Sequence, residues 1–493
     1  MMTEKKFIAF DLGAESGRCV AAVLKDQKIT LHEVHRFTTH NIKYDGGYYW
    51  DILAIYEEII EGLKNAQKAF GNDFSAIGVD TWGVDYVLID SQDRLIGYPY
   101  HYRDDRTDNI MDEAFKIVDK ENMYGLAGIQ FAQYNTVFQL LAEKKRKQSF
   151  LDFSDKILLM PDFLNYMLSG VKKAEYSIAS TTGLIDPVKR NWSWQLIEKF
   201  GFPKKIFPEI VEPGTKLGTL LPSIAKTTGL NPGIPIIATA GHDTASAVVS
   251  VPALGNNWAF LSSGTWSVMG IELNNPVLTT QAMKFNFTNE GGVEGTTRFL
   301  KNLIGLWPIQ ECRRYWLKEG KEYSYPELSG AGKDEGSVNA WVDLNDPRFL
   351  KAGEMPEKII AFLNETGQAV KTNVGFIIAV VLESLAFSYI NVIKEIEEVT
   401  GEKISKLHAV GGGIQNELLT QLTADATGRT VLAGPVEGTI VGNIGVQAIA
   451  SGAVTDLKVW REIVTGSFDV KKYEPFNTKY FNENEKKYTR ILK

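Results

Sequence analysis

Short apolar runs separated by polar turns make up the N-terminal part of the chain. The runs cover residues 7–12 (FIAFDL), residues 18–24 (RCVAAVL) and residues 29–38, where apolar and polar positions alternate. The connections between them are too short for a crossover helix, which a parallel pair of strands requires. The pattern therefore predicts three antiparallel strands that follow one another as a meander.

A helical pattern follows over residues 50–70. Its apolar residues recur at helical spacing and fall on one stripe, which consists of Ile52, Ile55, Tyr56, Ile59, Ile60 and Leu63. Gly71 and Asn72 are expected to end this helix. The next apolar run, residues 75–79, predicts a strand that ends in the polar sequence DTWG at residues 80–83.

A similar order of elements returns in the second half of the chain. Residues 258–262 predict a strand, residues 263–265 a tight turn and residues 266–273 a returning strand. A long helix is expected over residues 375–399, followed by a strand over residues 404–410 that ends in three glycines. We interpret the two occurrences, which lie roughly half a chain apart, as a structural duplication.

The boundary between the two halves is expected near residues 247–256. Residues 234–239 (IPIIAT) predict a buried strand, and residues 252–257 have the composition of a loop. A length of 493 residues suggests two or three domains. We therefore expect an α/β protein with two domains, residues 1–250 and 251–493, that face one another across a cleft.

The composition is that of an ordinary soluble protein, with 44% hydrophobic and 23% charged residues. The net charge of −7 argues against a general nucleic-acid or anionic-membrane binder, because both need concentrated Lys and Arg. The long helix predicted at residues 375–399 is interrupted by Glu383. We expect it to be too short and too mixed in composition to cross a bilayer.

Cysteine and histidine patterns bear on the cellular compartment. The two cysteines, Cys19 and Cys312, form no C-x-x-C pair, and the six histidines show no metal-binding spacing. The polar N-terminus lacks the apolar stretch of a secretory signal. A disulfide scaffold and structural zinc are therefore not expected, and we predict a protein of the reducing cytoplasm.

The sequence DLGAESGR, residues 11–18, is the first candidate nucleotide site. Gly13 and Gly17 leave this turn between two strands free to adopt positive φ angles, and its backbone N–H groups can bind phosphate oxygens. Asp11, at the end of the preceding strand, is placed to hold magnesium, which proteins bind with one or two carboxylates plus nucleotide phosphates. The alternative is an ordinary hairpin turn with a surface acid.

Two further glycine turns lie in the second half of the chain. SSGTW, residues 262–266, repeats the strand–turn–strand arrangement, and the two turns together can hold a triphosphate. GGGIQN, residues 411–416, lets the backbone pass close to a flat ligand such as adenine. This run is not the G-x-G-x-x-G fingerprint and is not part of an N-terminal βαβ unit, which disfavours a Rossmann dehydrogenase.

The sequence GHDT, residues 241–244, follows the strand predicted at residues 234–239. Asp243 is a candidate base that accepts the proton of a sugar hydroxyl as this hydroxyl attacks the γ-phosphorus of ATP. The alternative is a helix N-cap. Because phosphoryl transfer depends mostly on positioning and charge neutralisation, a weakly basic carboxylate is sufficient. His242 is either a ligand contact or a structural histidine.

Two more stretches are candidates for sugar contacts. GVDTWGVD, residues 78–85, offers carboxylates, an indole and a flexible Gly83, and YRDDRT, residues 102–107, is dense in charge. Sugar sites need polar groups for the hydroxyls and an aromatic face for the C–H surfaces. For the second stretch, a surface ion-pair cluster is the alternative.

Taken in order, these motifs resemble the FGGY carbohydrate kinases of the actin–sugar kinase–Hsp70 superfamily. The resemblance extends over residues 5–470 and rests on the segments DLGAESGR, VDTWGVD, YRDDRT, GIQFAQYNT, LMPDFL, GHDTASAV, LSSGTWS, TNEGG, LKNLIGLW and VGGGIQN. It implies two ribonuclease-H-like (actin-like ATPase) domains flanking an active-site cleft that closes on substrate. Residues 319–358 match least, and no role is assigned to them.

The resemblance also implies roles for individual residues. Asp243 matches the proton acceptor, and Asp11 matches an acidic residue near magnesium. The implied sugar contacts are Gly83 (through its backbone), His242, Asp243 and Thr244. The implied ATP contacts are Ala14, Glu15, Ser16, Gly17 and Arg18 in the first phosphate loop, and Thr265, Asn302, Gln310 and Gly412.

The implied reaction is phosphorylation of a sugar by ATP with Mg2+. Tyr102 and Thr244 replace the Trp and the Gln or Asn that are common in the wider superfamily. They favour the branch that phosphorylates the 1-hydroxyl of L-rhamnulose in L-rhamnose catabolism.

Three alternatives to this reaction are another ketose such as fuculose or xylulose, a non-catalytic nucleotide- and sugar-binding regulator, and an actin-like filament protein. The expected partners are ATP and the sugar, without nucleic acid or membrane. The chain is expected to act as a monomer or homodimer.

Overall fold

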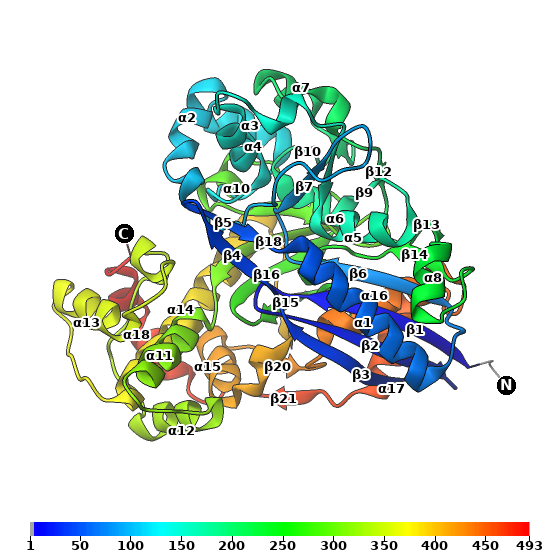
Figure 1. The fold of residues 1–493 in the computed structure, drawn as a ribbon. Helices are drawn as coiled ribbons and strands as arrows, with labels where there is room; N and C mark the ends of the chain where they lie inside the picture. Colours follow the sequence, from blue (N-terminus) through cyan, green and yellow to red (C-terminus); the bar gives the residue numbers. More distant parts are fainter. Residues whose placement is uncertain (1–3, 493) are drawn as a thin grey trace. The chain divides into compact units, whose positions relative to one another are not determined.

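The computed structural model describes residues 4–492, and Figure 1 shows the order of their helices and strands. The chain divides into two compact units. The first unit contains the described residues up to 252 together with residues 272–299 and 438–467. The second contains residues 253–271 and 300–437 and the described residues from 468 onward. Two segments that the sequence assigned to the C-terminal half therefore belong to the first unit.

A six-stranded sheet forms the centre of the first unit, in the order β13-β14-β6-β1-β2-β3. The first three strands pair antiparallel in sequence order, which confirms the predicted meander. β6 runs parallel to β1, and β14 runs parallel to β6, so these three strands end at one edge of the sheet. The strands are β1 (Lys5–Leu12), β2 (Ser16–Lys25), β3 (Lys28–Thr38), β6 (Ala76–Thr81), β13 (Thr215–Thr219) and β14 (Pro235–Ala238).

The predicted helix after the meander is α1 (Ile52–Phe70). It begins after Asp51, whose side chain accepts a hydrogen bond from the backbone N–H of Ala54 (3.1 Å), as an N-cap does. Four residues of the predicted stripe are buried, namely Ile52, Ile55, Ile59 and Leu63, whereas Tyr56 and Ile60 are partly exposed. The buried stripe packs against β1, β2 and β3.

Helix α16 (Gly438–Ala450) packs against β1 and β6, although it comes from the far end of the sequence. Successive residues of a strand point to opposite faces of its sheet. On β6, Ile77 and Val79 belong to the same hydrophobic core as α1, whereas Asp80 is bonded to Asn443 of α16. The sheet is therefore covered by α1 on one face and by α16 on the other.

The second unit is built on strands of a seven-stranded sheet, in the order β17-β18-β16-β15-β19-β20-β21. β17 (Thr288–Gly291) and the first residues of β18 (Thr297–Ile304) belong to the segment that returns to the first unit. The other strands are β15 (Trp258–Ser263), β16 (Trp266–Leu273), β19 (Lys406–Val410), β20 (Thr430–Ala433) and β21 (Lys471–Tyr473).

Five consecutive strands of each sheet share one order and one set of directions. β15 is antiparallel to β16 and parallel to β19, just as β1 is antiparallel to β2 and parallel to β6. β20 is parallel to β19 and antiparallel to β21, as β14 is parallel to β6 and antiparallel to β13. This correspondence confirms the predicted duplication and the α/β fold class.

The longest helix is α14 (Val374–Thr400), close to the bounds that the sequence predicts. With 27 residues, this helix is long enough and apolar enough to cross a membrane. The expectation that it is too short and too mixed in composition to cross a bilayer is therefore wrong. However, 89% of its most apolar window is buried inside the structure, as in a core helix. Glu383 is buried there and accepts hydrogen bonds from Trp341 Nε1 (2.8 Å) and the Tyr480 hydroxyl (2.6 Å).

A second hydrophobic core of the first unit lies between shorter elements. Its strands are β7 (Tyr86–Ile89), β8 (Lys156–Leu159), β9 (Ala174–Glu175), β10 (Ile185–Asp186), β11 (Asn191–Trp192) and β12 (Ile210–Val211). Its helices are α2 (Ile110–Ile117), α3 (Lys120–Ala127), α4 (Thr136–Lys144), α6 (Tyr176–Ala179) and α7 (Trp194–Lys199).

The region for which the sequence assigned no role, residues 319–358, carries α12 (Tyr325–Glu335), which packs along α14. The remaining strands are β4 (Asn41–Tyr44) and β5 (Gly47–Trp50). The remaining helices are α5 (Met160–Ser169), α8 (Pro222–Thr228), α9 (Asp243–Val249), α10 (Thr280–Lys284), α11 (Trp307–Lys318), α13 (Met355–Glu365), α15 (Glu417–Thr427), α17 (Leu457–Ser467) and α18 (Thr478–Thr489).

Candidate functional site

Three aspartates of the first unit gather where its three parallel strands end. Asp11 on β1 lies opposite Asp80 on β6 in the strand register. The backbone N–H of Thr81 donates to the Gly241 carbonyl (2.9 Å), which joins the end of β6 to the segment that carries Asp243. Ligands bind at this edge in open α/β sheets. The arrangement therefore places three carboxylates at one candidate site.

Asp80 is the most deeply buried of the three. Its Oδ2 accepts a hydrogen bond from Asn443 Nδ2 of α16 (2.5 Å), and Gln447 Nε2 in turn donates to Asn443 Oδ1 (2.7 Å). Burial raises the pKa of Asp80 well above its usual range, and the negative charges of Asp11 and Asp243 raise it further. The sequence flagged residues 78–85 for sugar contacts but did not predict this partner from α16.

The carboxylate of Asp243 has two unequal oxygens. Oδ1 accepts hydrogen bonds from the backbone N–H of Thr244 (2.5 Å) and from the Thr244 hydroxyl (3.1 Å), and it lies 3.4 Å from His242 Nε2. No described residue donates to Oδ2. The side chain is 32% exposed, so a ligand can reach it. Asp243 thus presents one oxygen that is held and one that is available.

Burial raises the pKa of Asp243 above that of an ordinary aspartate; His242 lowers this pKa and the charge of Asp11 raises it. Asp243 is the first residue of helix α9, and the N-cap position is occupied by His242. The alternative that Asp243 is the helix N-cap is therefore wrong.

The loop before Asp243 is held by a buried carboxylate. Glu175 Oε2 accepts a hydrogen bond from the Gly241 backbone N–H (2.9 Å), and the Ser177 hydroxyl oxygen accepts one from the His242 backbone N–H (3.3 Å). Glu175 also accepts bonds from the backbone N–H groups of Ser177 and Ile178. These bonds fix the backbone that carries His242 and Asp243.

The first predicted phosphate loop is a tight turn between β1 and β2. The Gly13 N–H donates to the Ser16 carbonyl (3.0 Å), and the Thr39 N–H donates to the Glu15 carbonyl (3.1 Å). Ala14 lies in the turn. Arg18 donates through Nε (3.1 Å) and Nη2 (2.8 Å) to one oxygen of Asp11, Oδ2. The turn therefore brings a guanidinium and a carboxylate together beside the loop.

Although glycine is free to adopt positive φ angles, neither Gly13 nor Gly17 of this turn has one. Gly17 is needed for close packing instead. A Cβ atom there would lie 2.4 Å from the Phe37 ring, well inside van der Waals contact. The alternative of a surface acid also fails, since Asp11 is paired and its side chain is only 13% exposed.

In the second unit, the other predicted ATP contacts gather around the turn between β15 and β16. Gln310 Nε2, in the first turn of α11, donates to the Thr265 hydroxyl (3.0 Å). Asn302 lies on β18, and the Gly305 N–H further along the chain donates to the Thr265 carbonyl (3.1 Å). Gly412 follows β19, the parallel neighbour of β15, and a Cβ atom there would meet nothing within 4 Å.

The predicted sugar stretches form a buried network in the first unit. Asp85 Oδ2 accepts bonds from Trp50 Nε1 (2.6 Å), Trp82 Nε1 (3.0 Å) and the Tyr102 N–H (3.1 Å), and Oδ1 accepts one from Gln139 Nε2 (2.9 Å). Burial raises the pKa of Asp85 to about 6. The network therefore fixes the indole rings of Trp50 and Trp82 and the backbone at Tyr102.

Gly83 lies in sequence between Trp82 and Asp85 of this network. A Cβ atom on Gly83 would lie 3.2 Å from Thr181, and the neighbouring Val84 N–H donates to the Thr181 hydroxyl (3.1 Å). The alternative of a surface ion-pair cluster at residues 103–106 is wrong in part. Asp104 is buried and accepts a bond from the Tyr48 N–H (2.7 Å), and the Arg106 side chain is only 9% exposed.

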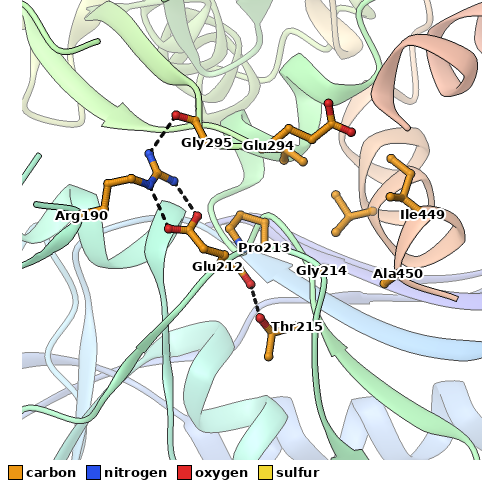
Figure 2. A pocket seen from close by; sticks show the side chains of 11 residues that line it. Arg190, Glu212, Pro213, Gly214, Thr215, Glu294, Gly295, Ile449 and Ala450 are labelled. Carbon is orange, nitrogen blue, oxygen red and sulfur yellow. Dashed lines mark hydrogen bonds and ion pairs between the residues drawn. The ribbon is translucent and has the colours of Figure 1, made fainter. Parts of the chain in front are cut away.

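Figure 2 shows a separate pocket of about 460 Å³ in the first unit. Arg190 and Glu212 form an ion pair beside it (2.6 Å), and its apolar wall includes Val446 and Ile449 of α16. None of the residues predicted to contact the sugar or ATP lines this pocket. The candidate site is therefore the strand-end cluster.

Two family models match the chain in sequence. The model for the N-terminal domain of the FGGY family of carbohydrate kinases matches residues 6–250, and the model for its C-terminal domain matches residues 259–451. The chain belongs to the FGGY family of carbohydrate kinases.

Curated relatives match this FGGY kinase over nearly its full length. A rhamnulokinase of Bacteroides thetaiotaomicron is 41% identical over 472 residues, which cover 96% of each chain. One of Oceanobacillus iheyensis is 41% identical and covers 94% of this chain and 97% of its own. One of Bacillus subtilis is 37% identical and covers 95% of both chains.

Solved structures of other kinases have the same fold as this FGGY kinase. A ligand-bound xylulose kinase from Lactobacillus acidophilus superposes with a TM-score of 0.83 at 16% identity, covering 99% of this chain and 97% of its own. A glycerol kinase from Plasmodium falciparum, solved with ADP, gives a TM-score of 0.78 at 15% identity, with 99% and 96% coverage. The two-domain α/β fold with actin-like ATPase topology is thereby confirmed.

Several residues of the candidate site in this FGGY kinase were not predicted from the sequence. Asn443 and Gln447 on α16 hold Asp80, and Glu175 holds the loop before His242. The segment TNEGG, at residues 288–292, was noticed only as part of the resemblance, and it carries Glu290, which lies 3.1 Å from His242 Nδ1. In a single sequence these residues follow ordinary helix and strand patterns, so no local signal marks them.

Proposed function

We propose that the chain is a rhamnulokinase, which transfers the γ-phosphoryl group of ATP to the 1-hydroxyl of L-rhamnulose and forms L-rhamnulose 1-phosphate and ADP. Relatives that carry this name are 37–41% identical to the chain over nearly its whole length. The observation that carries the chemistry is the Asp243 carboxylate, which is held through Oδ1 and has Oδ2 available. The reaction belongs to L-rhamnose catabolism.

In the proposed reaction, Asp243 Oδ2 accepts the proton of the sugar 1-hydroxyl. The hydroxyl oxygen forms its bond to the γ-phosphorus while the bond from this phosphorus to the β–γ bridging oxygen breaks and leaves ADP. Proton transfer to a weak base suffices, because the transition state is loose and catalysis depends on positioning. His242, Thr244 and the backbone of Gly83 orient the sugar, and the aromatic side chains around Asp85 offer faces for its C–H surfaces.

ATP binding is assigned to the turns at the strand ends of each unit. Ala14, Glu15, Ser16, Gly17 and Arg18 form the first phosphate loop, and Thr265, Asn302, Gln310 and Gly412 supply further contacts. Backbone N–H groups in such turns bind phosphate oxygens. The open space at Gly412 allows a flat base to approach the backbone closely.

Magnesium is expected to accompany ATP. The described residues contain no group of three or more His, Cys, Asp or Glu side chains arranged to hold a metal ion. A single carboxylate fits, since Mg2+ keeps several waters and is bound through one or two carboxylates plus substrate phosphates. We assign this role to Asp11, whose Oδ1 remains outside the bonds to Arg18. The ion would neutralise charge on the transferred phosphoryl group.

The test of the proposed function is an ADP-release assay with Mg-ATP and a panel of acceptors, namely L-rhamnulose, L-fuculose, D-xylulose, L-ribulose and glycerol. We expect a clear preference for L-rhamnulose in kcat/KM. A preference for another ketose would keep the kinase chemistry and replace the substrate. If none of the sugars stimulates ADP release, the chain would be a non-catalytic binder.

We further propose that the enzyme acts in the cytoplasm on free ATP and sugar, as a monomer or homodimer. Light scattering on the purified protein measures the mass directly. A mass above that of a dimer would contradict the oligomeric part of this proposal.

A further inference from the structure

A buried guanidinium lies next to His242. Arg298 on β18 has no exposed side-chain surface, and its Nε donates to the Gly291 carbonyl (2.8 Å). Its Nη2 donates to Glu290 Oε2 (3.1 Å) and lies 3.3 Å from His242 Nδ1. All of these residues belong to the first unit. Two groups therefore compete for His242 Nδ1, the Arg298 guanidinium and the Glu290 carboxylate.

The hydrogen-bonding capacities of these groups decide between two tautomers of His242. A guanidinium has donors only, and the two N–H bonds of Nη2 can serve Glu290 and an unprotonated Nδ1 at the same time. The ring proton then lies on Nε2, which is 3.4 Å from Asp243 Oδ1, an acceptor. With the proton on Nδ1 instead, the lone pair of Nε2 would face the Asp243 carboxylate. The first arrangement gives each ring nitrogen a partner, because Nδ1 accepts from Arg298 and Nε2–H faces Asp243 Oδ1.

We infer that Arg298 is a positioning residue, which holds His242 as the Nε2–H tautomer by donating to Nδ1 and thereby directs an N–H toward Asp243 Oδ1. This inference rests on the proposed role of Asp243 as the base. With a bond from His242 added to those from Thr244, Oδ1 has three donors. The carboxylate is then held with Oδ2 toward the sugar hydroxyl.

Packing alone does not account for the guanidinium. Arg298 Nη1 is buried, and no described group pairs with it. A buried charge with an unpaired donor is unfavourable for stability, and the same space could be filled by an apolar side chain. A role in orienting His242 provides a reason for a cation at this position.

The tautomer can be measured without any substrate. In protein labelled with 15N-histidine, long-range 1H–15N correlations distinguish an imidazole protonated at Nδ1 from one protonated at Nε2, and the signals that disappear in His242→Asn assign the ring. We expect the Nε2–H tautomer in the wild type. Arg298→Met, which removes the donors but keeps an apolar stem, should populate the Nδ1–H form bonded to Glu290.

The same variants are then assayed with the sugar that the acceptor panel identifies. Arg298→Met should lower kcat by about 100-fold, the scale of misplacing a proton acceptor, with a smaller change in KM for the sugar. Arg298→Lys keeps a charged donor and should retain much of the Nε2–H form, with a loss of about ten-fold. Should Arg298→Met fail to fold, Arg298→Lys and Glu290→Gln carry the comparison.

Two controls separate positioning from general destabilisation. Glu290→Gln should keep the Nε2–H tautomer, because Arg298 remains. Arg461→Met removes another buried arginine of the same unit, which is bonded to Glu272 (2.6 Å) and to the Val248 carbonyl (3.1 Å), and should leave the tautomer unchanged.

An Nδ1–H tautomer in the wild type would overturn the inference. So would an Nε2–H tautomer that persists in Arg298→Met, a loss of this tautomer in Glu290→Gln, or unchanged kcat in folded Arg298→Met. Since the tautomer is read in the free protein, its outcome is independent of the sugar and of failure of the proposed function.

Discussion

Asp243 combines a held oxygen with an available one. The two donors to Oδ1 come from the neighbouring Thr244, and His242 Nε2 lies 3.4 Å from the same oxygen. The orientation of the carboxylate is therefore set locally once the Gly241 backbone is fixed by Glu175. Such a carboxylate needs no further rearrangement to accept a proton, which is the condition for efficient general base catalysis.

We expect Asp243→Asn to lower kcat by about 100-fold or more, because the amide has the shape of the carboxylate but cannot accept the proton. The KM for ATP should change little, since Asp243 is assigned to the sugar. ADP release measured at saturating sugar checks both values. Near-normal turnover in a variant whose melting curve matches the wild type would show that Asp243 is not the base.

The pKa of about 6 for Asp85 predicts a pH-dependent contribution to stability. Burial favours the protonated form in the native state, whereas the unfolded chain holds this proton only below an ordinary aspartate pKa of about 3.9. The stabilisation is therefore fully present near pH 4 and is lost as the pH rises through about 6.

The measurement is a pair of denaturant titrations, of the wild type and of Asp85→Asn, from pH 4 to pH 7. The unfolding free energy of the wild type minus that of the variant should fall by about 2 kcal/mol over this range, because asparagine does not titrate. A constant or rising difference would mean that the four donors around Asp85 outweigh its burial.

Helix α9 follows β14, and helix α16 follows β20; each strand is the third parallel strand of its sheet. The two helices pack against each other within the first unit. Gly442 lies at their crossing. A Cβ atom there would be 1.6 Å from the Ser246 carbonyl oxygen, so the two helix backbones are in direct contact. Any side chain at Gly442 must move α9, whose first residue is Asp243.

Gly442→Ala is therefore expected to destabilise the protein by about 3 kcal/mol, at the upper end of overpacking, and to lower kcat as well. Gly466→Ala is the matched control, because Gly466 lies in α17 of the same unit and a Cβ atom there meets nothing within 4 Å. It should be neutral or slightly stabilising. Thermal melts and ADP release of both variants test this, and equal stability of the two would contradict the close crossing.

The first unit is discontinuous in sequence. Its sheet is covered on one face by α16, and Gln447 of that helix donates to the Ile8 carbonyl (3.0 Å) while Asn443 binds Asp80. A fragment that ends at residue 252 would expose this face of the sheet and leave the buried Asp80 without its amide partner. The unit thus depends on residues from the other end of the chain.

We expect the fragment of residues 1–252 to lack the cooperative thermal unfolding of the full chain. Joining residues 438–467 to this fragment through a flexible linker should restore part of the transition, because α16 buries apolar surface and satisfies Asp80. Calorimetry of the two fragments beside the full chain is the measurement. A sharp transition in the shorter fragment, at the temperature of the full chain, would contradict this dependence.

The sequence was sufficient to predict the order of elements and to select candidate site residues, some of which the fold brings together at one edge of the first sheet. The meander of β1–β3, the helix stripe of α1, the duplicated strand–turn–strand and the bounds of α14 are local patterns, since a period of two or 3.6 residues is set by backbone geometry. Asp11 and Asp243 were found because a polar turn directly follows an apolar run, which marks the end of a buried strand.

The sequence alone could not predict contacts between residues that are far apart along the chain. The return of α16 to the first sheet, the bond from Asn443 to Asp80 and the position of Arg298 beside His242 join segments separated by 56 to 439 residues. The close approach of Phe37 to Gly17 and the burial of α14 likewise depend on packing between elements. Hydrophobic periodicity specifies which face of an element is buried but not which element covers it, and that choice is made by tertiary packing.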